Sequence, residues 1–246
     1  MSDSKNQKKV ALVTGANKGI GLEIGRQLAT LHNMTVLIGA RDEARGREAA
    51  EKLSAGGLDA RAVVLDVTDQ QTIDAAAQRI TTELGRLDVL VNNAGIAIDQ
   101  APPSQIEMDV LRRTYETNVF GVFAVTKAML PLLRRSTAGR IVNLSSGLGS
   151  LAQNSDPNWE FAAVKLLAYN SSKTALNAMT VQFAAELKDA GIKVNAADPG
   201  YTATDMNKHQ GTRTVAQGAA AAVRLATLPQ DGPTGGFFDE SGPVPW

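Results

Sequence analysis

Tyr169 and Lys173 are the two side chains in this sequence whose types and spacing best suit proton transfer. They stand four positions apart, so on a helix they would share one face, one turn from each other. A free tyrosine has a pKa of about 10 and is a poor acid or base near neutral pH. A nearby ammonium stabilises the phenolate, and a lowering of the pKa by about three units requires roughly 4 kcal/mol in a partly desolvated pocket. The spacing therefore indicates acid–base chemistry at Tyr169. The alternative is an exposed Tyr/Lys pair without a role.

A glycine-rich segment runs from Thr14 to Gly21, with glycines at positions 15, 19 and 21. It follows an apolar run at 9–14 and opens a helical pattern at 19–31. Glycine lets the backbone approach a pyrophosphate, and a helix N-terminus supplies free N–H groups. The segment therefore predicts a dinucleotide phosphate site, although its spacing differs from the G-x-G-x-x-G fingerprint. The alternative is a tight turn that needs glycine for its backbone conformation.

Two basic residues indicate which dinucleotide would bind. Lys18 lies inside the glycine-rich segment, and Arg41 follows the next apolar run in Gly39-Ala40-Arg41-Asp42. An acidic residue at this place would accept hydrogen bonds from the ribose hydroxyls of NAD and repel a phosphate. A guanidinium binds a 2′-phosphate instead. We therefore expect NADP(H) as the cofactor; otherwise both residues are solvated surface cations.

The elements that must position these residues alternate along the chain. After the first strand and helix, strands are predicted at 36–38, 62–65, 87–91, 141–144, 192–194 and about 236–239, and helices at 42–53, 69–84, 119–135 and 170–190. Strands that are apolar on both faces predict a Rossmann-type doubly wound parallel sheet with helices on both sides. We expect one α/β domain over residues 1–246, with residues 1–8 flexible.

Composition excludes several other classes of protein. Among the 246 residues, 25 are Lys or Arg and 25 are Asp or Glu, so a broadly basic nucleic-acid binder is not expected. The chain has no cysteine and two histidines, which exclude a disulfide framework, a thiolate nucleophile and a His-rich metal site. No apolar stretch approaches a membrane span and the N-terminus lacks a signal-peptide pattern. We expect a cytoplasmic protein without a metal, nucleic-acid or membrane partner.

Further motifs follow the predicted strands in a recognisable order. They are the Thr14–Gly21 turn, Asp66, Asn92-Asn93-Ala94-Gly95, Asn118, Ser146, Tyr169 with Lys173, and Pro199-Gly200. No single motif is specific for one family, but this set of motifs in this order is. Over essentially its whole length the chain resembles the short-chain dehydrogenase/reductase family. The spacing between Ser146 and Tyr169 exceeds that of most members and resembles the carbonyl-reductase-like branch, which carries an insert there.

The resemblance implies a set of cofactor-binding residues. They are Gly15, Asn17, Lys18, Gly19, Ile20, Gly21, Arg41, Asp66, Val67, Asn93, Ala94, Gly95, Tyr169, Lys173, Pro199, Gly200, Thr202 and Thr204. Asp66 and Val67 would hold the adenine, residues 93–95 the adenosine ribose, and the two threonines the nicotinamide carboxamide. In the alternative interpretation, Asp66 caps a helix and Pro199-Gly200 forms a plain turn.

The resemblance also implies the catalytic roles. Tyr169 would protonate the carbonyl oxygen during reduction, and Ser146 would hydrogen-bond the same oxygen. Lys173 would also hold the nicotinamide ribose, and Asn118 would link Lys173 to solvent through water. Strand alternation makes Ser145 and Ser146 point apart without deciding between them. The family pattern selects Ser146.

Two segments are expected to surround the substrate. An insert at about 154–167 contains Trp159 and Phe161, either of which could form an apolar wall; a peripheral surface loop is the alternative. Residues 202–215 form a predicted lid, in which His209 is expected to be a solvated loop residue rather than a catalyst. Although the insert could cover the usual pairing helices, we expect a homodimer or homotetramer.

These observations favour an NADPH-dependent reductase of ketones or aldehydes that also runs in reverse. A catalytically silent NADP(H)-binding regulator is the alternative, although the intact Ser146, Tyr169 and Lys173 argue against it. A third hypothesis, epimerisation or dehydration of a nucleotide-linked sugar, is disfavoured because such enzymes usually have a larger C-terminal part. The motifs do not identify the natural substrate. The aromatic and aliphatic residues expected near the pocket favour a small, moderately apolar carbonyl compound.

Overall fold

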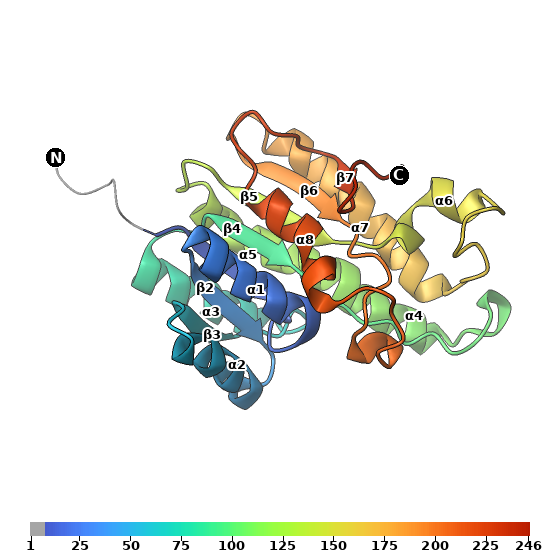
Figure 1. Cartoon of the computed structure of the whole chain (residues 1–246), viewed down its shortest axis with the longest axis horizontal. Coiled ribbons are helices and arrows are strands. Elements are labelled where there is room, and N and C mark those ends of the chain that lie inside the picture. Colours follow the sequence, from blue (N-terminus) through green and yellow to red (C-terminus); the bar gives the residue numbers. More distant parts are fainter. Residues whose placement is uncertain (1–7) are drawn as a thin grey trace.

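A seven-stranded parallel sheet forms the centre of the molecule in the computed structural model, which describes residues 8–246 (Figure 1). The strands lie in the order β3-β2-β1-β4-β5-β6-β7. Their bounds are Val10–Thr14 for β1, Thr35–Ala40 for β2, Ala60–Val64 for β3, Val89–Asn92 for β4, Arg140–Leu144 for β5, Lys193–Ala197 for β6 and Phe237–Phe238 for β7. The order reverses between β1 and β4, so the predicted doubly wound α/β fold is confirmed. In such folds ligands bind beyond the carboxyl ends of the strands at this reversal.

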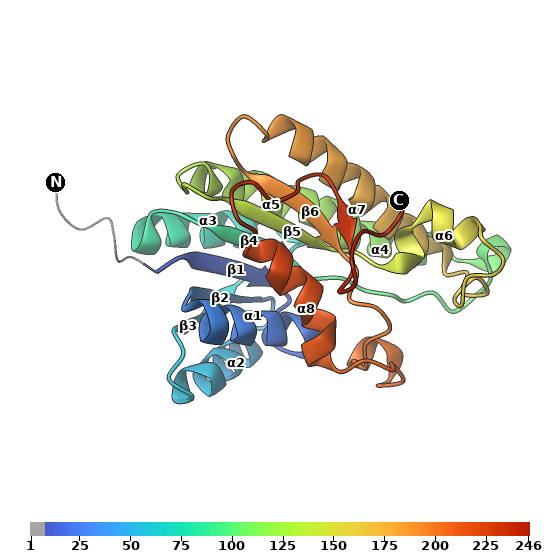
Figure 2. The same cartoon turned by 45° about the horizontal axis from the view of Figure 1, so that its top comes forward.

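Helices cover both faces of the sheet. The bounds are Gly19–His32 for α1, Glu43–Ala55 for α2, Gln70–Leu84 for α3, Met108–Tyr115 for α4, Gly121–Leu133 for α5, Leu151–Ser155 for α6, Leu167–Glu186 for α7 and Val215–Ala226 for α8. In Figure 2, α1, α2 and α8 lie on one side of the sheet, and α3, α5 and α7 lie on the other. Short helical turns are η1 (Pro103–Gln105), η2 (Glu116–Phe120), η3 (Gly147–Gly149) and η4 (Asp205–Asn207).

The two covered faces of the sheet explain why its strands are mostly apolar. In β1, Ala11 and Val13 join the core cluster that contains α1 and α8 residues. Val10 and Leu12 point the other way, into the cluster that contains α3, α5 and α7 residues. Because successive side chains alternate between two buried layers, an apolar side chain is favoured at each of these positions.

Helical structure is more extensive than the sequence patterns predicted. The helix expected at 119–135 is the end of a longer run, in which α4 passes through the π-helical η2 into α5. The helix expected at 170–190 begins and ends earlier, at Leu167 and Glu186. The predictions did not include α8, whose N-terminus is fixed by a capping box between Thr214 and Gln217.

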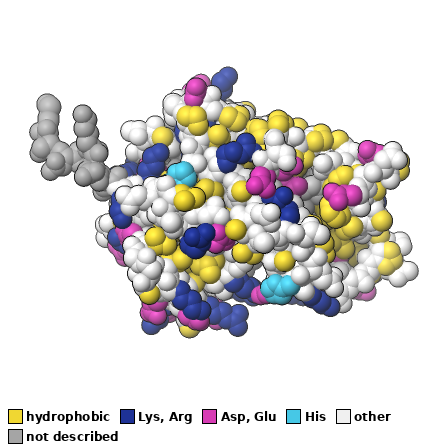
Figure 3. Space-filling model, viewed as in Figure 1, with side chains coloured by type: hydrophobic (Ala, Val, Ile, Leu, Met, Phe, Trp, Pro, Cys, Tyr) yellow, Lys and Arg dark blue, Asp and Glu magenta, His cyan; other side chains and the backbone are white. Residues whose placement is uncertain are grey.

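Charged side chains of both signs are mixed over the face drawn in Figure 3. Within residues 8–246, no helix is both long and apolar enough to cross a membrane. The flexibility predicted for residues 1–8 falls almost entirely outside the described residues.

Candidate active site

Tyr169 lies in the first turn of α7, held there by a carboxylate from a distant loop. Asp99 accepts hydrogen bonds from the backbone N–H groups of Ala168 (2.7 Å) and Tyr169 (3.2 Å). The N-cap residue Leu166 has no side chain that could serve these donors. A negative charge at a helix N-terminus is also favourable because it faces the positive end of the helix dipole. The loop after β4 therefore fixes where α7 and its tyrosine begin.

Lys173 lies one turn further along α7 and is only 4% exposed. Its Nζ donates a hydrogen bond to the carbonyl oxygen of Leu144 at the end of β5, at 2.7 Å. The same nitrogen lies 5.6 Å from the centre of the Tyr169 ring. The structure therefore brings Tyr169 and Lys173 to one place, beside the carboxyl end of β5.

The two serines that follow β5 have different surroundings. The buried Ser145 hydroxyl donates to Asn177 Oδ1 at 2.6 Å, in the interior under α7. Ser146 shares a side-chain hydrogen bond with Tyr169 and also accepts from the backbone N–H of Leu148 at 3.2 Å. Ser146, not Ser145, is thus the serine that faces the tyrosine.

The titration of this pair differs from the sequence expectation. Burial raises the pKa of Tyr169 to about 12, opposed by the Ser146 hydrogen bond and assisted by the negative charge of Asp198. Burial also lowers the pKa of Lys173 to about 8, against the attraction of Asp198. The sequence interpretation expected a lowered tyrosine pKa beside both the ammonium and an oxidised nicotinamide; in the protein without cofactor, removal from water is the largest influence and raises this pKa. Tyr169 keeps its proton, as a proton donor must.

Asn118 lies in the π-helical segment η2 and ties three segments together. Its Oδ1 accepts from the backbone N–H of Ile96 at 2.8 Å, and its Nδ2 donates to the Ile96 carbonyl oxygen at 2.9 Å. The same Nδ2 donates to Ser172 Oγ, next to Lys173, at 3.0 Å. A π-helical turn re-aims a side chain that a regular helix would point elsewhere. Asn118 thereby contacts both the loop after β4 and α7.

The glycine-rich turn between β1 and α1 has the shape of a phosphate cradle. Gly15 and Gly19 have positive φ angles of 63° and 57°. A Cβ at Gly21 would meet Asn93 Nδ2 at 2.4 Å, so only glycine fits there. The first turn of α1 has no acidic residue, and its N-cap, Lys18, makes no side-chain cap. Free N–H groups and an uncrowded backbone fit the pyrophosphate of a dinucleotide.

The loop after β4 closes this turn from the other side. The Asn93 amide donates to the carbonyl oxygen of Thr14 at 2.8 Å, and the Thr14 hydroxyl accepts from the backbone N–H groups of Asn93 and Ala94. A Cβ at Gly95 would lie 3.3 Å from Asn118 Oδ1 and 3.5 Å from Lys173 Nζ. Residues 93–95 therefore connect the cofactor turn to the Tyr169–Lys173 pair.

The two basic residues expected at the 2′-phosphate have different partners. Arg41 is exposed just beyond β2 and forms no ion pair with any other residue in the range 8–246. Lys18 is bound to Asp205 in the predicted lid, at 2.5 Å, and His209 Nε2 lies 2.8 Å from the same carboxylate. Lys18 is thus available to a phosphate only if it leaves Asp205.

The remaining predicted cofactor residues surround the same end of the sheet. Asp66 follows β3 and accepts from the backbone N–H and hydroxyl of Thr68, while Asp69, not Asp66, caps α3. The turn after β6 has Gly200 at a φ of 65°. Six more predicted residues complete this set: Asn17 and Ile20 in the turn into α1, the buried Val67, Pro199 directly before Gly200, and Thr202 and Thr204 at the start of the lid.

The insert before α7 lies against the site rather than away from it. Trp159 and Phe161 are 5.4 Å apart in an edge-to-face arrangement, and Phe161 lies 5.9 Å from the ring of Tyr201 in the segment after β6. Trp159 Cζ2 would be 3.3 Å from a Cβ at Gly147, the residue after Ser146. The aromatic side chains of the insert therefore lie close to the residue that follows Ser146, and their part as a wall of the substrate pocket stays a prediction.

Sequence reasoning missed two carboxylates of this site. Asp99 accepts a hydrogen bond from the backbone N–H of Tyr169. Asp198 lies half-buried directly after β6, and its negative charge raises the pKa of both Tyr169 and Lys173. Neither residue stands in a recognisable motif. A polar residue at the carboxyl end of a parallel strand was the one available signal, and it applied to Asp198.

A doubly wound sheet with an open helix N-terminus at its reversal point defines a dinucleotide-binding protein. The profile of the short chain dehydrogenase family matches residues 9–214, and the chain belongs to this family. It is 39% identical to the NADPH carbonyl reductase 3 of Mus musculus, with 91% of this chain and 92% of the relative covered. It is 36% identical to short-chain dehydrogenase/reductase 1 of Saponaria officinalis, with 98% and 97% covered.

Solved structures give the same assignment. The NADPH-bound carbonyl reductase from chicken fatty liver superposes with a TM-score of 0.86 at 28% identity, covering 98% of this chain and 100% of that one. Salutaridine reductase from Papaver somniferum superposes with a TM-score of 0.81 at 30% identity, covering 94% and 99%. The family and the carbonyl-reductase-like resemblance predicted from the sequence are confirmed.

Proposed function

We propose that the protein is an NADPH-dependent reductase of ketones or aldehydes, with Tyr169 as the proton donor. The observation that carries the proposal is the protonated, half-buried Tyr169 beside Ser146 and Lys173, at the open end of a dinucleotide-binding sheet. The NADPH named for the carbonyl reductase relatives supports the choice of cofactor, as does the unpaired Arg41.

NADP(H) would supply the hydride to the carbonyl carbon, and the residues of this chain do the rest. Ser146 would donate a hydrogen bond to the carbonyl oxygen and stabilise its developing negative charge. Tyr169 would deliver its phenolic proton to the same oxygen as the alcohol forms. Lys173 would turn from the Leu144 carbonyl toward the ribose, and its charge would stabilise the phenolate left on Tyr169. Asn118 would hold the backbone at Ile96 for a water that returns the proton.

The cofactor would be held by the turn between β1 and α1 and by the loops after the other strands. The N-terminus of α1 would receive the pyrophosphate, and Arg41 with Lys18 would bind the 2′-phosphate. Asp66 and Val67 would face the adenine, residues 93–95 the ribose, and Pro199, Gly200, Thr202 and Thr204 the carboxamide. The open α1 N-terminus and the glycines that tolerate no side chain support this placement.

The decisive experiment is NADPH oxidation with a panel of ketones, aldehydes and quinones, repeated with NADH and with Tyr169→Phe. We expect turnover with NADPH that falls by about a hundredfold or more in Tyr169→Phe, because general acid catalysis typically contributes 10²–10⁴-fold. NADPH affinity should stay within a few-fold, which shows that the variant is folded. Undiminished turnover in Tyr169→Phe would exclude this tyrosine as the donor. NADPH binding without turnover of any compound would favour the silent regulator.

The protein is further proposed to form a homodimer or homotetramer in the cytoplasm. Phe120, Phe123 and Val181 are exposed apolar residues on η2, α5 and α7, and they support pairing through these helices. The mass in solution tests the oligomeric state.

A further inference from the structure

Asp198 lies between two loops that the proposed reaction needs. It directly follows β6, where its backbone N–H donates to the carbonyl oxygen of Phe238 in β7 at 2.8 Å. The preceding residue, Ala197, accepts from the backbone N–H of Ser145 at 2.7 Å. The end of β6 is therefore held from the β5 side and from the β7 side, and the Asp198 side chain starts from a fixed point.

The Asp198 carboxylate accepts a hydrogen bond from one residue in each loop. Its Oδ1 accepts from the backbone N–H of Gly200 at 2.9 Å, in the turn after β6. The carboxylate also accepts from the backbone N–H of Gly147, the residue that follows Ser146. One side chain thus connects the loop that carries the serine with the turn that would hold the nicotinamide carboxamide.

Both loops reach the carboxylate at a glycine, and each glycine has little room for a side chain. A Cβ at Gly147 would lie 3.0 Å from Asp198 Oδ2. Gly200 has a φ of 65°, and a Cβ there would meet Arg213 Cδ at 2.7 Å. The close approach of two backbone segments to one carboxylate therefore accounts for glycine at both positions.

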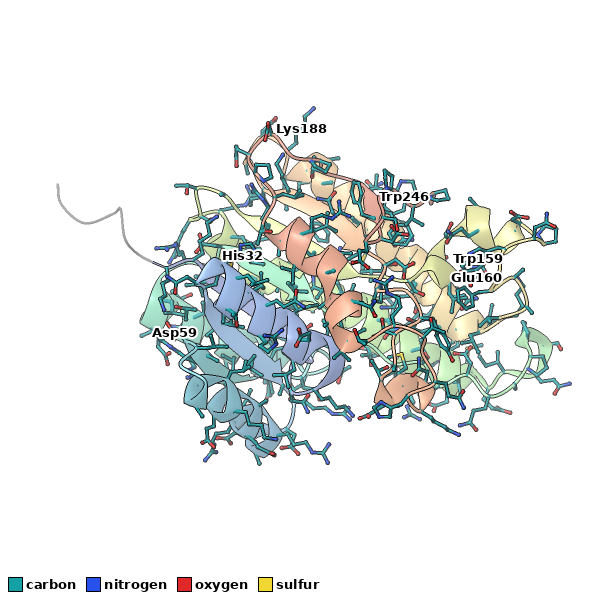
Figure 4. The ribbon with its side chains drawn as sticks, in the orientation of Figure 1. His32, Asp59, Trp159, Glu160, Lys188 and Trp246 are labelled. Carbon is teal, nitrogen blue, oxygen red and sulfur yellow. The ribbon has the colours of Figure 1, made fainter. Side chains whose placement is uncertain are left out.

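Two residues that precede α7 pack around the same place. Gln153 Oε1 would lie 3.0 Å, and Trp159 Cζ2 3.3 Å, from a Cβ on Gly147. Figure 4 shows Trp159 in the insert, at the end of the molecule where α6 lies. Gln153 Oε1 is buried without a hydrogen-bond partner in the described chain, and turning this amide makes its nitrogen a third donor to Asp198. These neighbours therefore fix the position of the carboxylate.

The charge of Asp198 acts on the two residues that would transfer the proton. It raises the pKa of Tyr169 and the pKa of Lys173. Burial raises the pKa of Asp198 itself and the charge of Asp239 adds to this rise, whereas the two backbone hydrogen bonds and Arg213 oppose it. Loss of the Asp198 charge should therefore lower the pKa of both the tyrosine and the lysine.

We propose that Asp198 is a positioning residue of the reductase, whose carboxylate holds the Ser146 loop and the turn after β6 at a fixed separation. A carbonyl oxygen bound to Ser146 and Tyr169 is thereby kept opposite the nicotinamide ring. Asp198 touches neither substrate nor cofactor in this role and acts through the backbone of Gly147 and Gly200. This inference rests on the proposed reductase function and adds a residue to its machinery.

The kinetic test uses initial rates with a carbonyl compound that the wild type reduces. In Asp198→Ala both loops lose their acceptor, and we expect kcat to fall by about tenfold to a hundredfold, because a small misplacement of reacting groups slows the reaction. KM and NADPH affinity should change by less than about threefold. Asp198→Asn keeps one oxygen for Gly200 and should retain more activity. In both variants the fall of kcat/KM at high pH should begin at a lower pH, because the charge is lost.

Asp239→Asn is the matched control for these measurements. Asp239 is also a half-buried carboxylate that follows a strand, and its Oδ1 accepts from the backbone N–H groups of Ser241 at 2.7 Å and Gly242 at 2.8 Å. Neither of these residues belongs to the two loops, so kcat and the pH profile should stay at wild type. Wild-type kcat in Asp198→Ala, or an unshifted high-pH limb in both Asp198 variants, overturns the positioning role.

Hydrogen exchange of the cofactor-free protein separates this inference from the reductase proposal. In Asp198→Ala, the amides of Gly147 and Gly200 should exchange faster by about tenfold or more, the usual effect of losing a hydrogen bond to a charged group. Peptides covering 145–149 and 199–204 report both amides, and both should keep wild-type exchange in Asp239→Asn. Faster exchange in both segments supports the connection even if no carbonyl compound is reduced and the reductase proposal fails. Wild-type exchange in both segments overturns the connection and leaves the reductase proposal intact.

Discussion

At the scale of a single residue, Arg41 is proposed to select the cofactor, since it is exposed beyond β2 and forms no ion pair in the described chain. Arg41→Asp should weaken NADPH binding by about tenfold to a hundredfold, the range for a lost charge-assisted bidentate contact, and should shift the preference toward NADH. Dissociation constants for both cofactors measure this. Arg45→Asp, which changes an exposed charge one turn into α2, should leave the NADPH/NADH ratio near wild type. An unchanged ratio in Arg41→Asp would remove the 2′-phosphate assignment.

Lys173 should make the stability of the cofactor-free protein depend on pH. Its pKa is about 8 in the fold and 10.5 ordinarily. Between these values the unfolded chain binds more protons than the folded one, so the free energy of unfolding rises with pH in this window. We expect Lys173→Met to remove a rise of roughly 1 kcal/mol per pH unit between about pH 8 and pH 10. Urea unfolding at several pH values measures the slope.

The exposed Lys127→Met, on α5, provides the control for that slope and should retain the wild-type rise. Above this pH window, Tyr169 makes the free energy of unfolding fall with rising pH. Its pKa is raised from 10 to about 12, so its contribution to stability is lost as the pH rises through that range. A wild-type slope in Lys173→Met would mean that the buried lysine does not titrate as described.

At the scale of the element, α7 owes the position of its first turn to Asp99. Asp99→Ala leaves two backbone N–H groups without their acceptor and should cost about 1 kcal/mol of stability, as the loss of a helix cap does. Because one of these groups belongs to Tyr169, kcat should fall more than KM changes. Urea unfolding and initial rates give both quantities.

The matched variant for this element is Asp156→Ala. Its carboxylate accepts from the backbone N–H of Asn158, in the exposed part of the insert, and does not touch α7. We expect a stability change below about 0.5 kcal/mol and an unchanged kcat. Equal losses in the two variants would mean that the Asp99 contact has no special part in placing Tyr169.

At the scale of the whole molecule, the ion pair between Lys18 and Asp205 joins the first turn of the fold to the segment after β6. Both side chains are exposed, so solvent screens this pair and its contribution to stability is small. Asp205→Asn frees Lys18 for the cofactor phosphate, so we expect NADPH to bind more tightly by up to about fivefold at low salt. The gain should shrink as salt is added. Fluorescence titration measures the NADPH affinity. Asp109→Asn on α4 removes a negative charge elsewhere and is the control. Weaker NADPH binding in Asp205→Asn would show that the ion pair positions the lid for the cofactor.

The sequence by itself determined the fold, and it predicted the residues of the site. Strands buried on both faces are mostly apolar, and a phosphate turn must carry glycines where no Cβ fits, so both features leave a local pattern. The four-residue spacing of Tyr169 and Lys173 follows in the same way from helix geometry. Short-range constraints of this kind can be read without knowing how the chain packs.

Only the tertiary structure decided how these residues behave. Asp99 reaches Tyr169 across 70 positions, and Lys18 reaches Asp205 across 187, so neither contact leaves a local signal. The direction of the Tyr169 pKa shift in the protein without cofactor depends on burial, which raises this pKa and leaves no local pattern in the sequence. Likewise, Ser146 and not Ser145 faces the tyrosine because the end of β5 lies against α7. The packing of the chain determines which side chains lose water and which distant residues meet, and both determine the pKa values and hydrogen bonds of the site.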